Sequence, residues 1–496
     1  MSSIRALPSD SIGARARPAK GWLRTAVVLL AATLGLGACG GAEDPPDTSE
    51  SSSTEEVLVV QGGSLFDGTG DELVANPGIV VADGRIRAID GEAAEEALAN
   101  GARSVEVTAD QTILPGFFDL HAHHAVDLRG EGRVDETEVN PVLFLANGVT
   151  STFPAGEVQP ERMRDLRLRI EAGEQPGPRL FNSGPYFGSA RPGWDPEITP
   201  DEIRAQVDEW VEKGARGFKA KTITAPHLEA LIEQAHAHGL SVTGHLGSGY
   251  RGSVNPADAI RMGIDRIEHF MGGDAMPADS SAYASFVGMT PDMPEFQEVI
   301  QLYLDEGVNY DATLTAYGYY GEREPQVFDY FHDEMQYLTP YARELVEGRL
   351  PRDVNDSFER IYWVKRDLIK ELYDQGGGDL ITLGTDHPSW GEYFSGFSVH
   401  RELHAFVLAG IPPADALRFA TVNASRALGV QDELGTVEVG KFADLVIVDG
   451  NPLEDIRATR DVRLVMKNGE VYDPEELLSS VVGELGPHGP EELEEW

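Results

Sequence analysis

The 496-residue sequence predicts an α/β fold in which a parallel barrel carries a smaller β-domain. Short apolar strands alternate with helical patterns through the middle of the chain, which is typical of βα units around a parallel sheet. The two ends of this region are instead rich in short strands separated by turn signals. Ionisable residues end several of the middle strands, and in a barrel those strand ends meet at one mouth.

The start of the chain reads as an export signal rather than as part of the fold. Basic residues between positions 15 and 24 precede an apolar run, 26–36, that is too short to span a bilayer permanently. The run ends in Leu36-Gly37-Ala38-Cys39, which resembles the lipobox of bacterial lipoproteins, and Cys39 is the only cysteine. We therefore expect a signal peptide over 1–38 and an extracytoplasmic chain anchored to a bacterial membrane through lipid on Cys39. An ordinary cleaved secretory signal is the alternative.

Composition and charge limit the classes of partner. The chain is 41% hydrophobic and 25% charged, as globular proteins are, and its 40 basic against 83 acidic residues give a net charge of −43. Nucleic acid is a poor partner for so acidic a surface, so we expect none. A small-molecule substrate is the partner we expect, and assembly of identical chains stays open.

Short strands at both ends predict one small β-domain, built from 57–113 and 431–473 around a barrel over 114–430. Ala82-Asp83-Gly84 reads as a tight hairpin turn, and Lys467-Asn468-Gly469-Glu470 makes a second turn. Residues 39–56 are polar and of low complexity, as expected for a flexible tether. Residues 474–496 form an acidic tail with a helix-like piece near 475–482.

The strongest chemical signal is a strand-like run, 113–123, that ends in His121-Ala122-His123. Side chains two apart on a strand share a face, so the two imidazoles form half of a transition-metal site. His236-Ala237-His238 has the same spacing but lies in a helical pattern, where residues two apart do not face each other. We therefore take the first pair as the candidate and the second as a helix end.

Later strands supply further candidates at regular intervals. Lys219, His245 and His269 end three successive predicted strands, 26 and 24 residues apart, which matches about one βα unit of ~30 residues each time. Asp386 ends another apolar strand, 380–386, although it also reads as a helix N-cap. The 117 residues between His269 and Asp386 exceed two plain units and include aromatic residues that we interpret as a lid or substrate wall.

With these residues in this order, the chain resembles the amidohydrolase superfamily. The resemblance is to the branch of imidazolonepropionase-like and Xaa-Pro dipeptidase-like metal-dependent hydrolases. The resemblance spans roughly 57–472 and closes with Gly435-Thr436-Val437-Glu438-Val439-Gly440-Lys441-Phe442-Ala443-Asp444-Leu445-Val446, a segment characteristic of the superfamily. The other matching motifs are Pro115-Gly116-Phe117-Phe118-Asp119-Leu120-His121-Ala122-His123, Gly217-Phe218-Lys219, Gly244-His245, Ile267-Glu268-His269 and Gly384-Thr385-Asp386.

The resemblance implies a (β/α)8 TIM barrel, a β-sandwich flank and one or two divalent metal ions, with zinc the best match to the donor set. Carried over by position, His121 and His123 bind the more buried metal, and His245 and His269 bind the second. Lys219 is carboxylated and bridges both metals. Lys221 shares the strand face of Lys219, so a shift of register is the alternative. The metal ligands implied are His121, His123, Lys219, His245, His269 and Asp386, and Asp386 also moves the proton.

The function implied is a metal-dependent amidohydrolase. A metal-activated hydroxide attacks an amide-type C–N bond in a dipeptide, an N-acyl amino acid or a cyclic amide, and Asp386 carries the proton to the leaving amine. Two alternatives stay open. One is a lactonase or phosphotriesterase, because the same centre attacks esters; the other is a non-catalytic surface binding lipoprotein.

Overall fold

The computed structural model describes residues 56–128, 134–318, 325–328, 334–348, 356–388 and 394–493, all within the unit Thr54–Trp496. The predicted signal peptide, Cys39 and residues 40–55 of the tether lie outside the described residues, as does part of the aromatic stretch. None of the described helices combines the length and apolarity needed to cross a bilayer.

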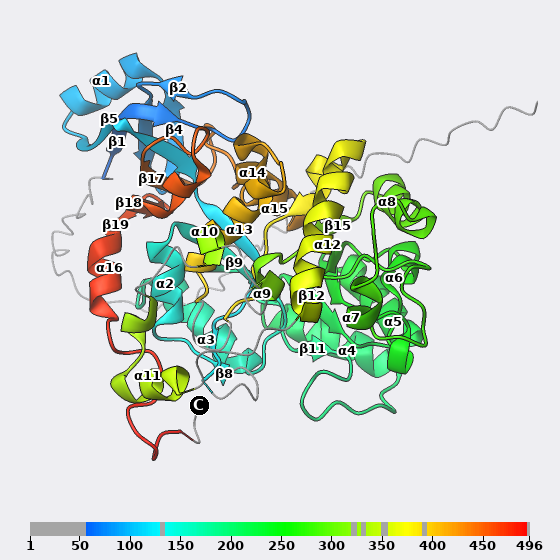
Figure 1. Ribbon diagram of the computed structural model, residues 1–496. Helices are drawn as coiled ribbons and strands as arrows, with labels where there is room; N and C mark the ends of the chain where they lie inside the picture. The colour runs from blue at the N-terminus through cyan, green and yellow to red at the C-terminus, as the bar shows by residue number, and fades with distance from the viewer. Residues whose placement is uncertain are drawn as a thin grey trace, which may run out of the picture. The chain divides into compact units, whose positions relative to one another are not determined.

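The smaller β-domain is a sheet assembled from both ends of the chain, as predicted. Figure 1 shows its blue N-terminal strands beside the orange and red C-terminal strands, in the order β19-β18-β17-β5-β1-β3-β4, with β2 paired to β1. An apolar cluster that includes Val60, Ile113 and Ile447 joins strands from the two ends, and helix α1 (Gly91–Ala99) packs on β3. The strands are β1 (Leu58–Leu65), β2 (Val74–Ala75), β3 (Gly78–Ala82), β4 (Arg85–Ile89), β5 (Arg103–Pro115), β17 (Leu445–Asp449), β18 (Val462–Lys467) and β19 (Glu470–Tyr472).

Both predicted hairpin turns are present. Asp83 and Gly84 have φ of 52° and 70° between β3 and β4, and Asn468 and Gly469 have φ of 52° and 78° between β18 and β19. Two central residues with positive φ suit the twist of a two-residue hairpin, which explains the Asp-Gly and Asn-Gly pairs. The helix-like piece of the tail is α16 (Pro474–Ser480), whose first turn is capped by the Asp473 carboxylate.

The middle of the chain forms the predicted parallel barrel. Its strands hydrogen-bond in two segments, β10-β9-β6 and β11-β12-β13-β14-β15-β16. The residues after β10 and before β12 connect these segments, because Arg216 N donates to Asn182 O at 2.7 Å. At the other seam Leu120 N donates to Leu383 O at 3.0 Å and Asp386 N donates to His121 O at 2.9 Å, which closes the barrel. The strands are β6 (Phe117–Ala122), β9 (Val149–Pro154), β10 (Arg179–Leu180), β11 (Tyr186–Phe187), β12 (Gly217–Lys221), β13 (Ser241–His245), β14 (Arg266–Glu268), β15 (Asn309–Asp311) and β16 (Ile381–Thr382).

Helices follow the barrel strands and bury an apolar face on them. The predicted unit from β12 to β13 contains α5, with Leu228, Leu231 and Ala235 buried, and the next unit contains α6. These side chains belong to one large core cluster with strand residues such as Phe218 and Val242, which point away from the barrel axis toward the helices. The main helices are α2 (Asn140–Ala146), α3 (Pro160–Glu171), α4 (Pro200–Glu212), α5 (Ala225–Ala237), α6 (Pro256–Met262), α7 (Ala282–Phe286), α8 (Pro294–Glu306), α9 (Thr315–Gly318), α12 (Asp356–Leu372), α13 (Phe397–Leu408), α14 (Pro413–Phe419) and α15 (Val422–Ala427).

One strand prediction is wrong in its extent. The run 113–123 is not one strand, because it is divided at Gly116 between β5 of the small sheet and β6 of the barrel. A Cβ on Gly116 would lie 2.2 Å from Thr150 Oγ1, so glycine at this position leaves room for the Thr150 side chain on the neighbouring strand β9. The histidine pair therefore belongs to β6 and the residues that follow it.

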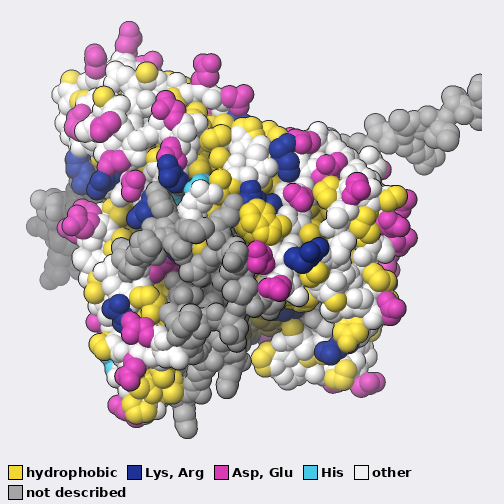
Figure 2. All heavy atoms as spheres, in the orientation of Figure 1, with side chains coloured by type: hydrophobic (Ala, Val, Ile, Leu, Met, Phe, Trp, Pro, Cys, Tyr) yellow, Lys and Arg dark blue, Asp and Glu magenta, His cyan; other side chains and the backbone are white. Residues whose placement is uncertain are grey.

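Acidic side chains are spread over the face of the molecule seen in Figure 2 rather than gathered on one element. This distribution agrees with a net charge of −43 carried by the whole chain.

Candidate metal centre

The histidine pair at the end of β6 meets the aspartate that follows β16. His123 Nε2 lies 2.9 Å from Asp386 Oδ1, and His121 Nε2 lies 3.4 Å from the same oxygen. The two imidazole rings have centroids 5.3 Å apart, so they share a face as the spacing predicted. Residues far apart in the sequence thus converge where β6 and β16 close the barrel.

The two later histidines reach the same place. The ring of His269 lies 4.8 Å from that of His121 and 4.3 Å from that of His245, and His269 Nε2 is 3.7 Å from Asp386 Oδ2. His269 and Asp386 have φ of 63° and 53°, a left-handed conformation that non-glycine residues seldom adopt. Such backbone strain clusters at functional sites, where the surrounding structure maintains it.

Lys219, rather than Lys221, points into this group. The Lys219 side chain is 1% exposed and its amine contacts the carboxylate of Glu268. Burial lowers the pKa of the Lys219 amine well below its usual value, and the charge of Lys221 adds to that effect. Lys221 is only partly buried and lies nearer the barrel mouth, so the structure favours the register in which Lys219 is the central lysine.

Sequence reasoning missed two carboxylates of the same cluster. His121 Nδ1 lies 3.4 Å from Glu268 Oε2 and 3.4 Å from Asp311 Oδ2, and both carboxylates are fully buried. Burial raises the pKa of Asp311 to about 7, against the opposing charge of Arg266. Glu268 ends β14, a strand that the sequence did indicate, so the search for ionisable residues at strand ends could have found it; Asp311 ends the three-residue strand β15, which shows no period.

The donor atoms fit a divalent metal. The ligand atoms of His121, His123 and Asp386 lie within 4.8 Å of one another, as do those of His121, Glu268 and His269. Among the described residues, His121 Nδ1, His269 Nε2 and both Asp311 oxygens find no hydrogen-bond partner although they are buried. Burial also lowers the pKa of His121, His245 and His269 well below the usual histidine value, which favours the neutral imidazole that binds metals.

Hydrogen bonds behind the cluster set its orientation. Thr313 Oγ1 donates to Ala312 O at 2.6 Å and therefore accepts from His269 Nδ1, also at 2.6 Å. This bond puts the proton of His269 on Nδ1 and leaves the lone pair of Nε2 facing the centre. Asp119 accepts from His121 N, Thr385 N and Thr385 Oγ1 at 3.0, 3.1 and 2.7 Å, which ties β6 to the segment that carries Asp386.

Replacing Thr313 by valine should weaken metal binding without unfolding the chain. Valine keeps the shape but removes the acceptor of His269 Nδ1–H, and outer-shell partners of this kind are worth about 10–100-fold in metal affinity. Chelator competition would measure the affinity, with the exposed Thr290→Val as control. Unchanged affinity in Thr313→Val would mean that the bond does not orient His269.

The second histidine pair is not part of the centre. His236 and His238 lie at the end of α5, where their Nε2 atoms contact Asp265 Oδ2 at 2.9 Å and Asp208 Oδ1 at 2.5 Å. Both side chains are about one third exposed. The helical interpretation of this motif is therefore confirmed.

Aromatic side chains line one side of the cluster. The rings of Phe270 and Tyr317 lie 6.0 and 5.9 Å from that of His269, and Tyr283 packs against Phe270 at 4.9 Å. Tyr317 belongs to the aromatic stretch for which a substrate wall was predicted, whereas Tyr319, Tyr320, Tyr330 and Phe331 lie outside the described residues.

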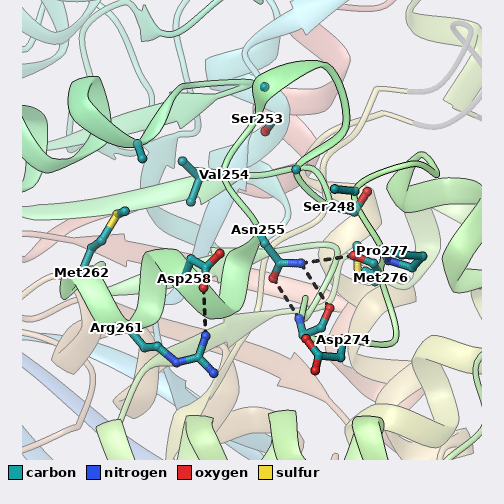
Figure 3. Close-up of a pocket in the computed structure, with 15 residues that line it drawn as sticks. Ser248, Ser253, Val254, Asn255, Asp258, Arg261, Met262, Asp274, Met276 and Pro277 are labelled. Atoms are coloured by element: carbon teal, nitrogen blue, oxygen red, sulfur yellow. Dashed lines mark hydrogen bonds and ion pairs between the residues drawn. The ribbon is translucent and has the colours of Figure 1, made fainter.

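A cavity of about 750 Å³ lies beside the loops that follow β13 and β14. Figure 3 shows Asn255 among the residues that line it. Asn255 Nδ2 donates hydrogen bonds to Gly273 O and Met276 O and so holds the two loops together. Among the described residues that line this cavity, none belongs to the histidine–carboxylate cluster. The cavity is therefore separate from the candidate centre.

Comparison with known proteins places these observations in a family. The model of the amidohydrolase family matches residues 112–472. Ochratoxinase of Aspergillus niger is 23% identical over 486 residues, covering 85% of this chain and 88% of that protein. The 5-methylthioadenosine/S-adenosylhomocysteine deaminase of Caldanaerobacter subterraneus subsp. tengcongensis is 33% identical over 113 residues, 19% of this chain. The matched segments span only 26%, 18% and 17% of three such deaminases.

Solved structures agree on the fold. A Xaa-Pro dipeptidase with bound methionine in the active site superposes with a TM-score of 0.62 at 22% identity, covering 84% of this chain and 100% of that chain. Phenylurea hydrolase B gives a TM-score of 0.62 at 18% identity, covering 87% and 100%. At these identities the likeness concerns the barrel and its β-domain.

Proposed function

Because this chain belongs to the amidohydrolase family, we propose that it is a metal-dependent hydrolase of amide-type C–N bonds. The observation that carries the proposal is the buried cluster in which His121 lies within 3.4 Å of three different carboxylates. Its relatives and structural neighbours include a dipeptidase, a phenylurea hydrolase and an ochratoxinase, which supports a hydrolytic reaction. A dipeptide, an N-acyl amino acid or a cyclic amide is the substrate class we propose.

We propose that His121, His123 and Asp386 hold one metal ion and that His245 and His269 hold a second. Nitrogen and carboxylate donors of this kind suit zinc. Lys219 would join both positions as a carbamate, because a lysine ammonium is a poor ligand, whereas the carbon dioxide adduct of the neutral amine is an anion whose charge is shared by two oxygens. The contact between Lys219 and Glu268 would then give way to metal coordination, and mass spectrometry of the intact metal-loaded chain would detect the adduct.

The metal ligands and Asp386 would contribute to different steps of the hydrolysis. A divalent metal bound here would lower the pKa of a water toward ~7 and polarise the substrate carbonyl. Asp386 lies at the edge of the cluster with 18% of its side chain exposed, so it can both contact the attacking water and reach the leaving group. It takes a proton from the water and delivers it to the amine, which leaves poorly without that proton. His123 Nε2 faces the same carboxylate at 2.9 Å, so the two groups converge on the metal position proposed for them.

A substrate panel would test the proposal on the metal-loaded chain. We expect turnover of dipeptides, N-acyl amino acids or cyclic amides that stops with a chelator and returns with added metal. Turnover of lactones or phosphotriesters alone would overturn the C–N assignment in favour of an esterase-type centre. Fewer than one metal per chain after gentle purification and reconstitution, without turnover, would favour a binding lipoprotein.

We further propose that the mature chain is attached to a bacterial membrane through lipid on Cys39, on the extracytoplasmic side. The apolar run and small residues that precede this single cysteine support the proposal. Cys39→Ser should move the protein from the membrane fraction to the soluble fraction and abolish labelling by a radioactive fatty acid. Membrane retention of Cys39→Ser would contradict lipid anchoring.

A further inference from the structure

Lys221 lies above the centre, one layer closer to the barrel mouth. It shares the inward face of β12 with Lys219, and a strand rises ~3.3 Å per residue, so the two lysines are about 7 Å apart along the strand. In the register of the sheet Lys221 is directly opposite His245 on β13. Lys219 is buried, whereas Lys221 is partly exposed, so Lys221 lies on the side from which a ligand enters the barrel.

An aromatic ring supports this ammonium. Lys221 Nζ lies 5.3 Å from the ring centroid of Tyr186, within the ~6 Å over which a cation is attracted by an aromatic face. Tyr186 is itself 8% exposed, and its ring packs so closely on Gly156 that a Cβ there would approach it to 2.0 Å. The position of the Tyr186 ring beside Lys221 thus depends on glycine at position 156.

Lys221 brings a positive charge to a centre that also holds the carboxylates of Glu268, Asp311 and Asp386. Because the whole chain is acidic, with a net charge of −43, an anionic ligand needs a cation to hold it there. Lys221 provides that cation beside His245, whose pKa its charge helps to lower.

We infer that Lys221, supported by Tyr186, binds a carboxylate of the substrate while the scissile carbonyl lies at the histidine–carboxylate cluster. This inference rests on the proposed function and narrows its substrate class to amides that carry a free carboxylate, such as N-acyl amino acids and dipeptides, rather than neutral cyclic amides. If Lys221 only packed on Tyr186, its removal would affect charged and neutral ligands alike.

Binding of a matched pair of ligands to the metal-loaded full chain would test this inference. We would measure by calorimetry the Kd of N-phenylsulfonylglycine, which has a carboxylate, and of its neutral carboxamide, with a sulfonamide in place of the scissile amide so that turnover does not disturb the equilibrium. We expect the wild type to prefer the carboxylate by about tenfold or more, which equals ~1.4 kcal/mol. Lys221→Met should lose that preference through a weaker Kd for the carboxylate ligand alone, and Lys221→Arg should keep most of it.

The control is Lys213→Met, which removes a different lysine ammonium that also lies over an aromatic ring. Lys213 Nζ lies 4.4 Å from the ring centroid of Trp210 on the outer helix α4, away from the centre. Its variant should leave both Kd values unchanged. Equal weakening of both ligands in Lys221→Met, or no preference in the wild type, would overturn the inference.

Binding is measured so that the two proposals can fail separately. A chain that hydrolyses no amide but shows the Lys221-dependent preference would overturn the proposed function and support the carboxylate site. A chain that hydrolyses neutral amides without the preference would support the proposed function and overturn the carboxylate site.

Discussion

Replacing His121 by alanine should remove bound metal and reduce kcat/KM by about 10³-fold or more, because a catalytic metal supplies several kcal/mol of transition-state stabilisation. His121 is the residue whose loss should be most severe, since its ring belongs to both groups of ligand atoms in the cluster. Metal content per chain and kcat/KM would be measured together. A variant that kept its metal and its full activity would remove His121 from the site.

The chain contains a matched control for this experiment. His236→Ala changes a histidine with the same His-x-His spacing, but its ring pairs with Asp265 at the end of α5. We expect metal content and turnover like those of the wild type. Thermal unfolding of both variants would show whether a loss in His121→Ala comes from the centre or from the fold.

Asp386→Asn should lower kcat by about 10²–10⁴-fold, the usual contribution of a positioned general acid–base group. Asparagine keeps the shape and one oxygen but cannot accept the proton that the leaving amine needs. Because that proton matters most when the leaving group is a poor one, the loss should be larger for an alkyl amide than for an activated anilide. Steady-state kinetics over a series of leaving groups would measure the difference.

The control for Asp386→Asn is Asp379→Asn, in the segment that leads into β16. The Asp379 side chain is 85% exposed and pairs with Arg426 on the surface, so its variant should match the wild type. A loss in Asp386→Asn that is the same for every leaving group would indicate a role in holding metal rather than in moving the proton.

The sequence could predict those strand-helix-strand units in which buried residues recur over enough positions to reveal the period of a helix or strand. The strand-helix-strand unit from β12 to β13 spans the full helix α5, and its buried residues recur at helical spacing. The Asp-Gly and Asn-Gly turns were equally clear, because their chemistry requires positive φ. The predicted run began at Ile113 and so included only the end of central strand β5; its first part, from Arg103, was missed because it is mostly exposed and shows no apolar run.

The missed carboxylates have a different explanation. β15 has three residues, too few to show a period, so Asp311 could not be assigned to a strand end. Glu268 and His269 are adjacent, and on a regular strand adjacent side chains point to opposite faces. The left-handed backbone of His269, with φ of 63°, breaks this alternation and allows both side chains to reach the centre.

The division at Gly116 has a consequence for how the polypeptide matures. β5 continues into β6 through this one glycine, and β5 pairs along one side with β17, which is made more than three hundred residues later. Until residue 449 has emerged from the ribosome, that side of β5 is an open edge able to pair with other nascent chains. Truncations that stop at the end of the barrel should consequently aggregate, even though every histidine and carboxylate of the centre has already been synthesised.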